Sequence, residues 1–238
     1  KKSKQSDLVV SGSPSSLTYS ATNAPTSTLS FTGGSGTGAV SYAVDPTSIA
    51  ICSINGNVVT ALSAGDCVVN ATKAGDVNYA DATTSITLKV NKAAQSAITT
   101  TADAGSLVYS QTTPATTNLS TTGGTTGNDV TYAVADSSKS ICSVTGNVVT
   151  ALGAGTCVVN ATKSGDNNYL DVKTSVSIVI AKSNQVALTP SVTNSAISYS
   201  PTTPGTSTIS TSGGSGDGAV SYAVADESKS ICSITGSV

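Results

Sequence analysis

Apolar side chains in this sequence recur at every second position over short runs, which is the spacing of half-buried β-strands. Residues 27–32 alternate in this way, with Leu29 and Phe31 on one face. Residues 39–44 and 85–90 show the same alternation. Because no stretch of ten residues carries the 3.6-residue apolar period of an amphipathic helix, the pattern predicts an all-β fold.

Turn residues separate these runs and mark further strands. Asn55-Gly56 predicts a hairpin turn of the I′ type. Asp45-Pro46 ends a strand, because proline cannot donate to the ladder. Gly12 and Pro14 are expected to end the first strand. The remaining candidate strands of the first repeat are Leu8–Val10, the fragment with Leu17 and Tyr19, Ile51–Ile54, Val58–Leu62 and Cys67–Lys73.

Seven or eight short alternating strands in about 90 residues predict an immunoglobulin-like β-sandwich. The tyrosine of the third main strand, which runs from Ala39 to Val44, is expected to point into the core. Its equivalents further along the chain lie 90 residues apart: Tyr42, Tyr132 and Tyr222.

The chain repeats itself with a period of 90 residues and without gaps. Residues 56–76 read GNVVTALSAGDCVVNATKAGD, and residues 146–166 differ from them at only three of 21 positions. This period exceeds the 20 to 50 residues of solenoid units, so each copy is predicted to be a whole domain. We expect three repeats, 1–91, 92–181 and 182–238. Their short junctions, without Pro or Gly, favour end-to-end stacking.

The third repeat is expected to be incomplete, because it lacks the equivalents of the last two strands. One interpretation is that the sequence is a window on a longer protein, which we favour because Lys1 aligns with the junction residues Asn91 and Ala181. The alternative is that a neighbouring molecule inserts its own strands into the gap. Lys1, Lys2 and Lys4 precede no apolar signal segment, so a leader has been removed or the chain comes from the middle of something longer.

Composition excludes several classes of function. The chain has no His, no Arg and one Glu, and its net charge is -2. A basic surface for nucleic acid is therefore not expected, and His-dependent nucleophilic catalysis lacks its base. We expect no enzyme activity. No apolar run approaches the length that spans a bilayer.

Five cysteines fall at positions that suggest one bridge per repeat. Cys52 and Cys67 are 15 residues apart, as are Cys142 and Cys157, whereas Cys232 stands alone. A zinc site would need four ligands, and without His it would require two domains to meet. One disulfide in each intact repeat, formed in an oxidising compartment, is the simplest account. The alternative is a pair of reduced, buried thiols. Cys232 is expected to be unpaired, since its partner would stand at position 247.

Two sets of polar residues are candidate binding or modification sites. Oxygen side chains that could bind calcium cluster after the sixth main strand, although the same residues suit a turn held by a packed tyrosine. The calcium candidates are Asp76, Asn78, Asp81, Asp166, Asn168 and Asp171. The N-glycosylation rule is met at Asn70, Asn118 and Asn160, which alternatively are polar residues on the exposed face of strands. No other cofactor is expected.

The segment from Cys52 to Tyr79, repeated from Cys142 to Tyr169, resembles the bacterial immunoglobulin-like repeats found in tandem in large surface proteins and adhesins. Cys232 to Val238 carries only the beginning of this pattern. The resemblance implies β-sandwiches on the bacterial exterior that extend, space or bind, and it carries no catalytic residues.

These observations predict a structural segment of an extracellular bacterial surface protein, an adhesin stalk or fibre. The alternatives are a subunit of a filament or surface layer, and a module that binds glycan or cell wall. The expected partners are neighbouring repeats of the same longer chain, identical chains in a fibre, or a glycan or protein at the host or cell surface.

Overall fold

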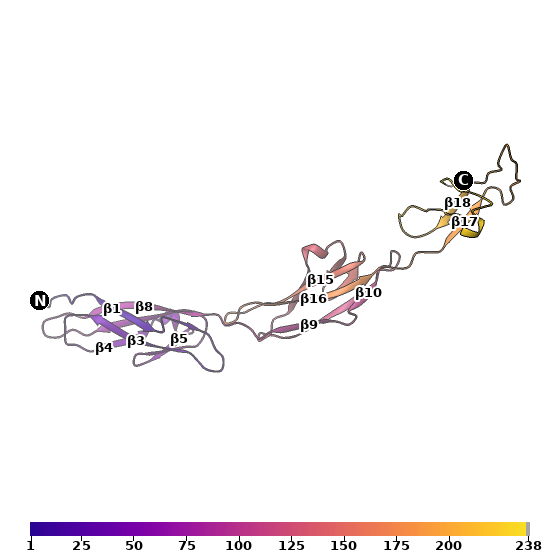
Figure 1. Ribbon diagram of the computed structural model, residues 1–238. Coiled ribbons are helices and arrows are strands. Elements are labelled where there is room, and N and C mark those ends of the chain that lie inside the picture. Colours follow the sequence, from indigo (N-terminus) through magenta and orange to yellow (C-terminus); the bar gives the residue numbers. More distant parts are fainter. Residues whose placement is uncertain (237–238) are drawn as a thin grey trace. The chain divides into compact units, whose positions relative to one another are not determined.

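The computed structural model describes residues 1–236, and its regular secondary structure consists of β-strands and short 3₁₀ turns (Figure 1). Residues 1–91 contain eight strands and one 3₁₀ turn. They are β1 (Leu8–Ser13), β2 (Ser16–Thr18), β3 (Thr26–Gly33), β4 (Val40–Val44), η1 (Pro46–Ser48), β5 (Cys52–Asn55), β6 (Val58–Ala61), β7 (Gly65–Lys73) and β8 (Ala82–Asn91).

Residues 92–181 repeat this set of elements in the same order. They are β9 (Ile98–Ala102), β10 (Ser106–Val108), β11 (Thr116–Gly123), β12 (Val130–Val134), η2 (Asp136–Ser138), β13 (Cys142–Thr145), β14 (Val148–Ala151), β15 (Gly155–Lys163) and β16 (Val172–Ala181).

Each of these two repeats is a sandwich of two four-stranded sheets. In residues 1–91 the sheet orders are β1-β3-β6-β5 and β2-β8-β7-β4. In residues 92–181 they are the equivalent β9-β11-β14-β13 and β10-β16-β15-β12. These orders correspond to the two sheets of immunoglobulin domains, with one strand added at an edge. The predicted fold class, tandem immunoglobulin-like sandwiches, is confirmed.

The added strand arises because the first segment of each repeat contributes to both sheets. β1 pairs antiparallel with β3, and β2 then pairs parallel with β8 in the opposite sheet. Gly12 does not end β1, contrary to the prediction, because β1 continues to Ser13. A Cβ atom on Gly12 would lie 2.7 Å from Leu88 Cδ2, so the missing side chain lets β1 pass close to the opposite sheet.

The inward faces of the two sheets form one core in each sandwich. In residues 1–91, alternate residues of β6, β7 and β8 are buried, as the period of two predicts. They are Val59, Ala61, Cys67, Val69, Ala71, Leu88 and Val90. Their equivalents, Val149, Ala151, Cys157, Val159, Ala161, Ile178 and Ile180, form the core of residues 92–181.

Tyr42 and Tyr132 are only half-buried, although the sequence predicted core positions. Both pack against the edge of the core clusters. The reason is topological: β4 is the last strand of its sheet and β5 is the last strand of the other. A side chain on β4 therefore lies beside the open edge of the sandwich.

The turn between β5 and β6 differs from the predicted type. Asn55 pairs with Val58, so the two loop residues are Gly56 and Asn57. Gly56 has a φ of 61°, and within residues 1–236 every positive φ belongs to a glycine. A type I′ turn needs two residues with positive φ, whereas glycine in the first loop position fits type II′. Gly146, with a φ of 58°, occupies the same position in the second repeat.

The chain divides into two compact units, residues 1–181 and 182–238. The second unit contains β17 (Leu188–Val192), β18 (Ile209–Gly213) and η3 (Asp226–Ser228), with β17 and β18 paired. Its residues 220–224, the equivalent of β4, are not in a strand. In residues 1–91 that segment pairs with β7, whose equivalent would lie beyond position 238. Among the described residues, no helix is long and apolar enough to cross a membrane.

Candidate functional site

The cysteines of the two intact repeats form disulfides between the sheets. Cys52 on β5 is bonded to Cys67 on β7, with their Cα atoms 5.8 Å apart. Cys142 and Cys157 form the equivalent bridge between β13 and β15. Since β5 and β7 belong to opposite sheets, each bridge holds the two layers of its sandwich together. Cys232 is free and exposed.

A buried glutamine holds three segments together at the end of each sandwich. The side chain of Gln95 is 8% exposed, and its Nε2 points to the carbonyl oxygens of Lys163, Ser164 and Leu170 at 2.9–3.2 Å. Its Oε1 accepts from the backbone N–H groups of Thr125 and Thr126 and from the Thr126 hydroxyl, each at 3.1 Å.

Gln5 occupies the same place in the first repeat. It is 3% exposed, donates to the carbonyls of Lys73, Ala74 and Ala80, and accepts from the N–H of Gly36. The sequence interpretation missed both glutamines. The available signal was the repetition of Gln5, Gln95 and Gln185 at intervals of 90 residues.

The calcium candidates of the first repeat accept hydrogen bonds from the backbone. Asp76 Oδ1 accepts from the N–H groups of Asn78 and Tyr79, and Asp76 Oδ2 accepts from Thr37. Asp81 Oδ1 accepts from the N–H of Gly75 at 2.8 Å. These carboxylates shape the loop in the way typical of aspartate in turns.

The second repeat builds the same loop. Asp166 accepts from the N–H groups of Asn168 and Tyr169, and Asp171 accepts from Gly165. Within residues 1–236, no three His, Cys, Asp or Glu side chains come together as metal ligands. Calcium binding stays a prediction. The amide and carboxylate oxygens of this loop are the ligands that a calcium ion would use.

The hydrogen bonds to Asp76 make one pH-dependent prediction. The N–H of Thr37, followed by those of Asn78 and Tyr79, lowers the pKa of Asp76 to about 2. An aspartate in an unfolded chain titrates near pH 3.9. We therefore expect Asp76 to stabilise the loop fully above about pH 4, and this stabilisation to be lost as the pH falls towards 2. NMR titration of the Asp76 carboxyl checks this. A midpoint near 4 would contradict it, and Asp76→Asn is the control that should remove the transition.

The asparagines of the three glycosylation motifs all lie on exposed strand faces. Asn70 donates to Asp45 Oδ2, and Asn118 donates to Asp103 Oδ2, both at 3.1 Å. Asn160 is exposed on β15. These positions are accessible to modification, which stays a prediction.

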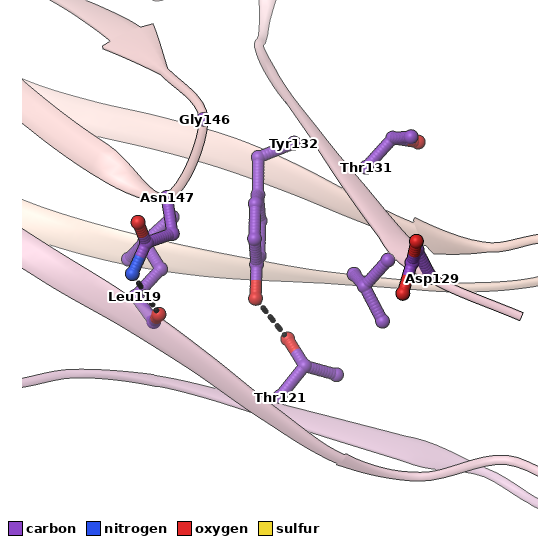
Figure 2. Close-up of a pocket in the computed structure, with 8 residues that line it drawn as sticks. Leu119, Thr121, Asp129, Thr131, Tyr132, Gly146 and Asn147 are labelled. Carbon is purple, nitrogen blue, oxygen red and sulfur yellow. Dashed lines mark hydrogen bonds between the residues drawn. The ribbon is translucent and has the colours of Figure 1, made fainter.

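A groove opens along the edge of the second sandwich, between β11, β12 and the β13–β14 turn (Figure 2). It has a volume of about 650 Å³. Figure 2 shows the Tyr132 ring between Asn147 and Asp129, with its hydroxyl directed at Thr121. The two hydroxyl oxygens are 2.9 Å apart, and Thr121 also contacts Thr100 at 2.7 Å. An aromatic ring flanked by amide, carboxylate and hydroxyl groups suits a polar ligand with an apolar face.

The first repeat has a smaller form of this groove. Its volume is about 460 Å³, and its lining includes Tyr42, Ile54 and Asn57. Phe31 stands where the second repeat has Thr121, so no hydroxyl faces the tyrosine there. Burial raises the pKa of Tyr42 above the ordinary tyrosine value. The two grooves therefore lie at equivalent positions and differ in volume and in the residue at the position of Thr121.

Comparison with known proteins gives similarity of limited extent. No protein family matches the sequence, and no curated protein matches it. The resemblance to bacterial immunoglobulin-like repeats therefore stays a hypothesis that rests on the repeated segments themselves.

Among solved structures, the chain is similar to tandem cadherin domains. Protocadherin gamma B2 extracellular cadherin domains 1–5 match with a TM-score of 0.33 and 12% identity, over 77% of this chain and 41% of that one. Human protocadherin-24 EC1-2 matches with a TM-score of 0.32 and 8% identity, over 77% of this chain and 100% of that one. Drosophila N-cadherin EC1-3 matches with a TM-score of 0.29 and 10% identity, over 70% of this chain and 63% of that one. The chain thus spans less than half of the first of these structures.

Proposed function

We infer that this chain is a non-catalytic structural segment of an extracellular bacterial surface protein, in which successive 90-residue sandwiches provide reach. The observation that carries this proposal is that one sandwich, with its own inter-sheet disulfide, is built twice with the same strand order. Disulfides persist in oxidising compartments. Whole domains repeated at a constant interval suit a spacer better than a single binding site.

The polar clusters support a structural role. The amide groups of Gln5 and Gln95 and the carboxylates of the Asp76 and Asp166 loops all bond to the backbone of their own repeat. Such groups hold loops in place. The proposed partners are neighbouring repeats of a longer chain, identical chains in a fibre, or a glycan or protein at a cell surface.

Electron microscopy of the source cells, with antibodies raised against residues 1–181, tests this proposal. We expect label at the cell surface, along thin projections. Lateral arrays of label would instead favour the alternative, a filament or surface-layer subunit. Label confined to the cell interior would contradict an extracellular function altogether.

A second candidate function, glycan or cell-wall binding, is favoured by the Tyr132 groove alone. Glycan-array binding of the full chain, compared with Asp129→Ala and Thr131→Ala, tests it. Both residues line the groove and are exposed, so the fold should be unaffected. Binding that both substitutions abolish would support this function. If the full chain binds no glycan on the array, only the structural role is supported.

A further inference from the structure

The first two repeats are in contact through a loop of the second repeat and a turn of the first. Asn168 lies in the loop between β15 and β16, and its Oδ1 accepts from the Ser63 hydroxyl and the Ala64 N–H, both at 2.8 Å. Ser63 and Ala64 form the turn between β6 and β7 of the first repeat. Beside this contact the rings of Tyr19 and Tyr169 meet edge to face, with centroids 5.6 Å apart.

Hydrogen bonds within the second repeat hold this loop in position, independently of its contact with the first repeat. Asp166 Oδ1 accepts from the N–H groups of Asn168 and Tyr169 at 2.8 and 2.9 Å. Ala93, just after the junction, donates its N–H to the Asn168 carbonyl and accepts from the N–H of Leu170. The junction and the loop therefore form one unit, which presents the Asn168 amide to the preceding repeat at little cost in conformational entropy.

The turn of the first repeat is equally well held. The N–H groups of Leu62 and Ser63 both donate to the carbonyl oxygen of Ile51, at 2.8 and 3.1 Å. Both halves of the contact are thus ordered by bonds within their own sandwich. A contact between two preformed surfaces has the character of a specific interface.

Within residues 1–181, the same two surfaces occur a second time without a partner in that unit. Asn78 has the same Asp76-held loop as Asn168 but is exposed, whereas Asn168 is half-buried. Ala154 is the equivalent of Ala64 and is exposed, whereas Ala64 is half-buried. The difference in exposure follows from whether an adjoining repeat covers the position.

We propose that the loop centred on Asn78 or Asn168 is a docking element for the preceding repeat, and that its partner is the β6–β7 type of turn of another repeat of this kind. By this assignment, the exposed Asn78 of the first repeat receives such a turn. The exposed Ala154 turn of the second repeat receives such a loop. The proposal rests on the proposed structural function and supplies the contact by which the repeats are joined.

The turns of the two repeats differ in the hydrogen-bond donors that they present. Ser63 of the first turn is replaced by Gly153 in the second, which has no hydroxyl. The joint at Ser63 therefore has two hydrogen bonds to the asparagine, and a joint at Gly153 has one, from the N–H of Ala154. We expect a contact at a turn of the Ser63 kind to be the stronger of the two, with the difference set by one side chain.

Amide hydrogen exchange of the full chain, followed by NMR, tests the contact. We expect the Ala64 amide to exchange roughly tenfold more slowly than the Ala154 amide, because only Ala64 donates to an asparagine. Asn168→Ala should remove this difference, and Asn168→Asp should preserve it because an acceptor oxygen remains. Asn78→Ala, the same change in a loop without a partner, should leave Ala64 unaffected. Equal exchange at Ala64 and Ala154 in the unaltered chain would overturn the proposal.

A chain lengthened by one repeat tests whether the Asn78 loop and the Ala154 turn bind each other. A second copy of residues 92–181 is placed before Lys2, with its Ala181 in the position of Lys1, so that the 90-residue period is kept. We expect the Ala154 amide of the added copy to become protected, and Asn78→Ala to abolish that protection. No protection in the extended chain would contradict the assignment. That result would leave surface labelling unaltered, so failure of this proposal is distinguishable from failure of the proposed function.

Discussion

Removing the disulfide of the second repeat, by Cys142→Ala with Cys157→Ala, is expected to lower the free energy of unfolding of that repeat by about 3 kcal/mol. The bridge closes a loop of 15 residues, and without it the unfolded chain gains conformational entropy. Both cysteines are also in the buried core, so their replacement by alanine leaves small voids that add to the loss.

Residue-resolved hydrogen exchange is the appropriate measurement, because the chain contains more than one cooperative unit and a single melting curve would average them. Amides of β15 and β16 should lose protection while those of β7 and β8 keep it. Cys232→Ala is the matched control, since that thiol is free and exposed, and it should change neither set. A loss below about 0.5 kcal/mol, the range of surface substitutions, would show that the bridge is not formed in the native protein.

Gln95→Ala is expected to destabilise the second repeat by about 2 kcal/mol or more. The substitution leaves the carbonyls of Lys163, Ser164 and Leu170 without their donor, and the N–H groups of Thr125 and Thr126 without their acceptor. Each buried group that loses its partner costs about 1–3 kcal/mol, and water can replace part of this at the less buried positions.

Gln95→Glu should be worse than alanine, because it places a carboxylate oxygen against three carbonyl oxygens. Gln185→Ala is the matched control, since Gln185 is exposed in the third repeat. Urea unfolding followed at amides of the loop and of β15 provides the measurement. Equal effects of Gln95→Ala and Gln185→Ala would show that the glutamine does not hold the loops together.

The sandwich class and the buried faces of its main strands were predictable from the sequence because their causes are local. The alternation of apolar residues in β7 and β8 fixes which face is buried, and a shift of one residue would expose the whole set. In β3 the pattern holds at Leu29 but not at Phe31, which is exposed. The 90-residue period then gives the second sandwich directly. The two bridges were also predictable from the sequence. Cys52 and Cys67 have the same spacing as Cys142 and Cys157, so the repeat itself indicated the pairs.

The strand boundaries and the turn type were less well predicted. The sequence places Gly12 at a strand end, yet the backbone continues through it because its neighbour in space is Leu88, 76 positions away in the chain. The Asn55-Gly56 pair satisfied the rule for one turn type, but the register of β5 against β6 moved the loop to Gly56 and Asn57. Register belongs to the pairing of strands, so no single dipeptide determines it.

By itself, then, the sequence determined the all-β class, the tandem sandwiches and the cysteine pairs, since these follow from spacings along the chain. Three features depended on the tertiary structure alone. They are the half-burial of Tyr42, the hydrogen bonds of the buried Gln5 and Gln95, and the contact of Asn168 with Ser63. The partners of Gln5 lie up to 75 residues away, and those of Asn168 lie 104 and 105 residues away. Such contacts leave no periodic pattern, because a hydrogen bond between distant loops requires only one suitable side chain at the place where folding brings the loops together.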